Sequence, residues 1–79
     1  MSKLFEVIKS LPDEPERKII WVAYNSNMAL GAANLMKLIK GEDYADSVIF
    51  VSRDELDPNL EGDIYYSPDL YDHIGNGAN

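Results

Sequence analysis

The chain has 79 residues, the size of one small domain, and its 46% apolar content is enough for a core. It contains no cysteine, which excludes disulfide bonds and thiolate chemistry. The formal net charge of −7 disfavours nucleic acid and anionic membranes as direct ligands, because Lys and Arg supply most of the binding to both.

The N-terminal third predicts a helix and then a strand. Apolar residues at helical spacing predict a helix over Ser2–Leu11, which Pro12 ends. Lys18–Tyr24 is a continuous β-branched and aromatic run, typical of a strand that is covered on both faces of a parallel sheet. This apolar run is too short to span a membrane, and no secretory signal precedes it, so we expect a cytoplasmic protein.

The middle of the chain predicts a βαβ unit. An apolar stripe predicts a helix over Asn27–Lys40, with Gly41 after its last turn. Glu42–Ser47 reads as an acidic turn, and Val48–Val51 as a short buried strand. Strand, helix and strand in this order give a right-handed crossover between parallel strands.

The last third predicts short elements. Ser52 and Glu55 have capping-box spacing, which indicates a single helical turn. Ile64–Tyr66 reads as a third strand, parallel or antiparallel, and Ser67 with Pro68 predicts the start of a helix over Pro68–Ile74. We therefore expect one α/β domain over residues 1–79, with a three-stranded, mainly parallel sheet, three helices in the order α-β-α-β-β-α, and a frayed tail at 75–79.

A phosphate site is one interpretation of the turn after the first strand. Asn25, Ser26 and Asn27 stand at a helix N-terminus, where many α/β proteins bind phosphate. The turn has neither a GxGxxG nor a GxxxxGK[ST] pattern, and no lysine. A purely structural helix cap is the competing interpretation.

Metal-binding patterns are incomplete. Asp57–Ile64 matches part of a calcium loop, but the twelfth position, which requires a bidentate Glu, is Pro68. His73, the single histidine, follows Asp69 at i,i+4, and two ligands do not complete a zinc site. No nucleophile is positioned for catalysis either, so we expect no metal, no cofactor and no enzymatic activity.

The charge is segregated along the chain. Residues 1–40 carry six basic and four acidic side chains, whereas residues 41–79 carry one basic side chain, Arg53, and ten acidic ones. Acids gathered on one face would form a surface for a basic partner, whereas scattered acids serve solubility. The residues predicted to bind such a partner are Asp54, Glu55, Asp57, Glu61, Asp63, Tyr66, Asp69 and Asp72.

The segments Val22–Ala29, Val48–Ser52 and Glu61–Tyr66 together resemble small phage-encoded α/β proteins, which look like truncated nucleotide-binding folds without the phosphate loop. The resemblance covers roughly residues 18–74 and carries over no catalytic residue. Small acidic phage proteins often inhibit host enzymes or defence systems, sometimes as DNA mimics.

Two functional hypotheses follow. In the first, the chain is a non-enzymatic inhibitor that docks its acidic half on a basic surface of a nucleic-acid-handling or defence enzyme in the host cytoplasm. In the second, it is a nucleotide- or phosphate-binding remnant that uses Asn25, Ser26 and Asn27. Small unstapled domains with open sheet edges often associate, so we also expect a homodimer.

Overall fold

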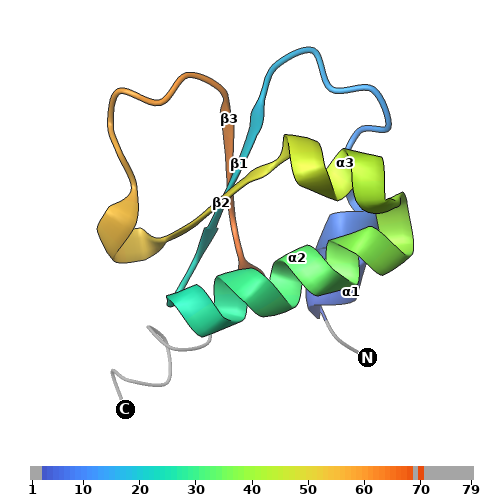
Figure 1. Ribbon diagram of the computed structural model, residues 1–79, viewed down its shortest axis with the longest axis horizontal. Helices are drawn as coiled ribbons and strands as arrows, with labels where there is room; N and C mark the ends of the chain where they lie inside the picture. The colour runs from blue at the N-terminus through green and yellow to red at the C-terminus, as the bar shows by residue number, and fades with distance from the viewer. Residues whose placement is uncertain (1–2, 69, 71–79) are drawn as a thin grey trace.

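The computed structural model describes residues 3–68 and residue 70. The described residues contain three complete α-helices, three strands and one short 3-10 helix, so the predicted α/β class is confirmed (Figure 1). The elements in chain order are α1 (Lys3–Ser10), β1 (Ile19–Ala23), α2 (Ser26–Lys40), α3 (Glu42–Ser47), β2 (Ile49–Ser52), η1 (Arg53–Glu55) and β3 (Asp63–Tyr66).

The three strands form one parallel sheet in the order β2-β1-β3. Trp21 in the central strand lies between Phe50 of β2 and Tyr65 of β3. The orientation of the third strand, which the sequence left open, is therefore parallel. All five residues of β1 are buried, as expected for a strand that is covered on both faces.

The two sheet faces have different covers. Ile19, Trp21 and Ala23 pack with α1, α2 and α3 on one face, called here the helix face. Ile20 and Val22 point to the other face, which residues 53–62 cross on the way from β2 to β3. We call these the crossover face and the crossover segment; Figure 1 shows the helices and this segment on opposite sides of the strands.

Handedness explains this division. Strands β2 and β3 lie on opposite sides of β1. The connection from β1 to β2 therefore runs across the sheet in one direction, and the connection from β2 to β3 runs in the other. Right-handed crossovers that run in opposite directions must pass over opposite faces. The helices therefore take one face, and the β2–β3 connection takes the other.

The helix face holds the larger core. Ile8, Trp21 and Met36 have 0% exposure, and Ala32 of α2 allows this helix to lie close to the sheet. The Trp21 indole N–H has no acceptor among the described residues. An unpaired buried donor costs about 1–3 kcal/mol, so apolar packing around the ring has to outweigh it.

The crossover face has a thinner cover. Leu56 and Leu60 of the crossover segment pack with Leu70 over Ile20 and Val22. This ten-residue connection is irregular apart from the single turn η1, which confirms the helical turn predicted from Ser52 and Glu55. It leaves Ile64 44% exposed and Tyr66 49% exposed.

The structure corrects the prediction for residues 42–47. They form α3 rather than a turn, because Gly41 at φ +102° links two helices. The Gly41 N–H donates to the Lys37 carbonyl, and the Gly41 carbonyl accepts from the Ala45 N–H. Acids in the first turn of α3 also suit the helix dipole.

The remaining boundaries differ by one or two residues. The strand predicted at Val48–Val51 is Ile49–Ser52, and it is half-buried except at Ser52 rather than fully buried. The helix predicted at Pro68–Ile74 begins at Pro68, with the Leu70 N–H donating to the Ser67 carbonyl. The rest of that helix and the predicted tail lie outside the described residues.

A polar clasp holds the end of α1 against the α2–α3 corner. Lys40 Nζ donates to the Leu11 carbonyl at 2.7 Å and pairs with Asp13 at 2.9 Å. Tyr44 donates its hydroxyl proton to the Pro12 carbonyl at 2.6 Å. Burial, followed by the nearby Tyr65 and Asp13, raises the pKa of Tyr44 above its usual 10.0.

Replacing Tyr44 by Phe tests this clasp. Tyr44→Phe should lower the free energy of unfolding by about 0.5–1.5 kcal/mol at neutral pH through loss of the hydrogen bond. Because the Tyr44 pKa is raised on folding, its contribution is complete below pH 10 and declines as the pH rises past the folded-state pKa. Urea unfolding from pH 8 upward should show the difference between the two proteins shrinking above about pH 10. A constant difference would contradict this account.

Two glycines form a matched test of the backbone. A Cβ at Gly62, which has φ +155°, would lie 2.3 Å from the Lys18 carbonyl oxygen, whereas one at Gly31 in α2 would meet nothing within 4 Å. We expect Gly62→Ala to destabilise the domain by at least about 1–3 kcal/mol. Gly31→Ala should stabilise it by about 0.5–1 kcal/mol, measured by thermal unfolding. Equal effects of the two substitutions would refute the proposed close approach.

Candidate functional site

The carboxyl ends of the three strands meet at one edge of the sheet. The chain leaves β1 toward α2 on the helix face, and it leaves β3 toward Leu70 on the crossover face. Neighbouring strands whose connections depart to opposite faces form a topological switch point, the usual ligand position in open α/β sheets. A ligand is therefore expected at this edge rather than elsewhere on the sheet.

Asn25 caps α2 at this edge. Its side-chain oxygen accepts from the Met28 N–H at 2.8 Å, and its carbonyl accepts from the Ala29 N–H at 3.0 Å. Asn25 therefore forms the helix cap that the structural interpretation of the turn predicts. The side chains of Ser26 and Asn27 in the first turn remain exposed to solvent.

A hollow of about 260 Å³ lies beside this helix end, between α2 and β2. Leu30 and Phe50 supply apolar wall, and Ser26, Ser52 and Glu55 supply the polar groups. Ser52 donates its hydroxyl proton to the Glu55 carboxylate at 2.9 Å. This bond connects the two residues predicted as a capping box, through their side chains rather than through the backbone.

Arg53 lies over the ring of Tyr24, with its guanidinium carbon 4.3 Å from the ring centroid. The stacking is a cation–π contact, and it holds Arg53, the one Lys or Arg of residues 41–79, at the carboxyl edge. Tyr24 directly precedes Asn25, the cap of α2. Asp54 and Glu55 follow Arg53 directly in the chain. The edge therefore combines one cation with two acids.

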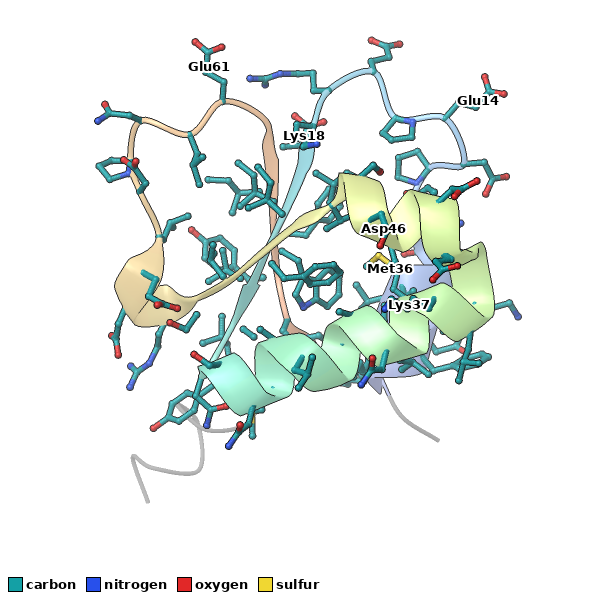
Figure 2. The ribbon with its side chains drawn as sticks, viewed as in Figure 1. Glu14, Lys18, Met36, Lys37, Asp46 and Glu61 are labelled. Carbon is teal, nitrogen blue, oxygen red and sulfur yellow. The ribbon has the colours of Figure 1, made fainter. Side chains whose placement is uncertain are left out.

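The crossover segment carries half of the predicted partner-binding residues. They are exposed, and they are Asp54, Glu55, Asp57 and Glu61. The segment itself passes over the crossover face, and Glu55 at its start also lines the hollow beside α2. Leu56 and Leu60 of the same segment turn inward. Figure 2 shows Glu61 at the amino-terminal edge of the sheet near Lys18, whereas η1 lies at the carboxyl edge.

The other predicted partner-binding residues differ in position. Asp63 begins β3 at the amino-terminal edge and pairs with Arg17 at 3.2 Å. Tyr66 lies on the crossover face, because its partner in the β1–β3 register is Val22, and its side chain is exposed. Asp69 and Asp72 lie outside the described residues, as does His73.

The acidic half of the sequence is not one face of the structure. Helix α3 contributes Glu42, Asp43 and Asp46 to the helical layer, on the opposite side of the sheet from the crossover segment (Figure 2). The three helices of that layer carry four lysines and four acids, so the charge of the helices is balanced: Lys3, Lys9, Lys37, Lys40, Glu6, Glu42, Asp43 and Asp46. The crossover segment, with four acids and Arg53, is the more uneven surface.

Ile64 is one of the exposed apolar residues that the sequence did not single out, together with Leu30 and Leu38. It shares a face with Tyr66, since both lie on β3 opposite buried residues of β1. Strand alternation predicts this shared face for positions two apart. The sequence contained no sign that the face would be left half open.

The partial calcium loop has a structural explanation. Asp57 accepts the Asn59 N–H at 2.8 Å through its carboxylate and the Leu60 N–H at 3.1 Å through its carbonyl, which closes a turn. Within residues 3–68 and 70, no group of three or more His, Cys, Asp or Glu side chains could hold a metal ion. No helix in that part of the chain has the length and apolarity to cross a membrane.

Comparison with known proteins adds no relative. No family model, curated protein or solved structure matches the chain.

Substitution of Asn25 tests its role as a helix cap. Asn25→Ala should lower the free energy of unfolding by about 0.5–2 kcal/mol, because the Met28 N–H loses its acceptor. Asn25→Ser should retain most of the stability, since serine also caps helices well. Chemical denaturation of the three proteins measures both effects, and an Ala variant as stable as the Ser variant would contradict the capping role.

Proposed function

We propose that this chain is a non-enzymatic protein-binding module whose crossover segment docks on a basic surface of a partner protein. The observation that carries the proposal is the set of four exposed acids in the crossover segment, which passes over the face on which Ile64 and Tyr66 are half-exposed. Protein interfaces commonly combine apolar and aromatic anchors with a polar rim. Ile64 and Tyr66 would be the anchors, and the acids would be the rim.

The charge pattern favours a basic protein as the partner. The helical layer is balanced, so its field partly cancels, whereas the crossover segment has one cation, Arg53, against four acids. A surface of one sign steers an oppositely charged partner and selects against acidic ones. A partner that handles nucleic acid, such as a host enzyme or a defence enzyme, has a basic groove of this kind.

The proposed mechanism is blockage. Acids spaced along an extended segment can occupy the groove that nucleic-acid phosphates would fill, so the bound module competes with the enzyme's own substrate. This mechanism needs no catalytic group on the module. It also agrees with the inhibitor function that the resemblance to small phage proteins implies.

Affinity capture with charge-reversed variants tests the proposal. The wild-type chain is used to capture partners from lysate at low and at high salt, and the captured proteins are identified by mass spectrometry. A triple variant with Asp54→Lys, Asp57→Lys and Glu61→Lys should weaken capture of the specific partner by on the order of tenfold to a hundredfold at low salt. Capture by the wild type should itself fall as salt rises.

A matched control changes the same net charge on the other side of the sheet. Reversal of Glu42, Asp43 and Asp46 in α3 should leave capture nearly unchanged, because α3 lies on the opposite side of the sheet from the crossover segment. Equal loss from both triple variants, or a specific complex that salt does not affect, would overturn the proposal.

A phosphate ligand is the second candidate, favoured by Arg53. Its guanidinium over Tyr24 lies next to the α2 cap, where Ser26 and Asn27 are exposed. A thermal-shift series with inorganic phosphate and nucleotides, with and without Mg²⁺, discriminates the two functions. A rise in melting temperature that Arg53→Ala abolishes would support this candidate over the protein-binding module.

A further inference from the structure

The proposed function uses the side chains of Ile64 and Tyr66 but not the backbone groups along the free edge of β3. In the order β2-β1-β3, strand β3 pairs with β1 on one side, and no described strand lies on its other side. The Asp63 N–H donates to the Lys18 carbonyl, and the Ser67 N–H donates to the Val22 carbonyl. Backbone groups alternate in direction along a strand, so those of Ile64 and Tyr66 point away from β1.

The same two residues present the exposed side chains of the strand. Ile64 is 44% exposed and Tyr66 is 49% exposed, on one face of the sheet. Two backbone N–H donors, two carbonyl acceptors and two apolar side chains thus lie together along one short edge. A strand is the ligand with the matching shape and hydrogen-bonding groups.

We propose that this edge pairs with the β3 edge of a second copy of the chain, antiparallel, to give a six-stranded sheet. A two-fold axis at Tyr65 places Ile64 of one copy opposite Tyr66 of the other. Each opposed pair then exchanges both backbone hydrogen bonds, so all four outward donors and acceptors are satisfied. The edge is therefore complementary to itself without any shift in register.

The side chains fit the same arrangement. Directly opposed residues of an antiparallel pair share a face, so Ile64 packs against the partner copy's tyrosine at position 66, and β-branched with aromatic pairs are favourable. The strand contains no Lys or Pro to block pairing. Its one charge, Asp63, already pairs with Arg17 and needs no cation from a partner.

Two edge variants and one control test the pairing. Ile64→Pro removes an outward N–H without touching the bonds to β1, and Ile64→Lys adds a charge to the edge. Leu38, 84% exposed on α2, provides the control Leu38→Lys. Sedimentation of the full chain from micromolar to near-millimolar concentration should show the wild type and the control reaching twice the 8.9 kDa monomer mass. The edge variants should associate at least about tenfold more weakly.

Hydrogen exchange identifies the interface without a variant. The amide hydrogens of Ile64 and Tyr66 should exchange slowly in concentrated wild-type protein and quickly after dilution. Three results would overturn the proposal: a monomer at all concentrations, a dimer that Ile64→Lys leaves intact in a folded chain, or a dimer in which these two amides still exchange quickly. Pairing of the edge only with an added basic peptide would assign it to a foreign strand and would likewise refute the second copy.

Discussion

The buried strand β1 determines the rest of the structure. Its five residues have no solvent-facing side, so each face of the sheet requires its own apolar cover. Neighbours on both sides in parallel orientation then require two crossovers, and the right-handed rule sends them over opposite faces. A chain of 79 residues supplies helices for one of those faces and an irregular segment for the other.

The unequal covers explain why the open surface lies where it does. The helix face receives large buried side chains such as Ile8 and Met36 from two helices. The crossover face receives Leu56, Leu60 and Leu70, which lie over Ile20 and Val22 of the central strand. The apolar side chains on this face therefore cover the central strand β1, and Ile64 and Tyr66 of the outer strand β3 remain partly exposed to solvent. Exposed apolar groups at this position are a consequence of topology, not of an unusual local sequence.

The sequence predicted elements better than it predicted surfaces. The apolar run around Trp21 and the stripe of α2 were strong local signals, so β1 and α2 appear within two residues of their predicted ends. Helix α3 was missed because its six residues are mostly polar and bury only Ala45, which gives no periodic pattern. The acidic half divides between two faces because strand order decides which side of the sheet each connection crosses. No local pattern in the sequence contains that order.

The same topology relates the acidic surface to the free edge. The crossover segment leaves β2 near Asp54 and reaches the start of β3 near Glu61, so it passes over the whole crossover face and Glu61 is its acid nearest the free edge in the chain. In an antiparallel pair of β3 strands, opposed side chains share a face, so the crossover faces of both copies would lie on the same side of the joined sheet. Two acidic segments would then face one partner, and two linked contacts bind more tightly than either alone when the partner can reach both. Self-association would therefore strengthen binding to a basic protein, because pairing places Ile64 and Tyr66 of the two copies side by side on the same face that the partner would contact.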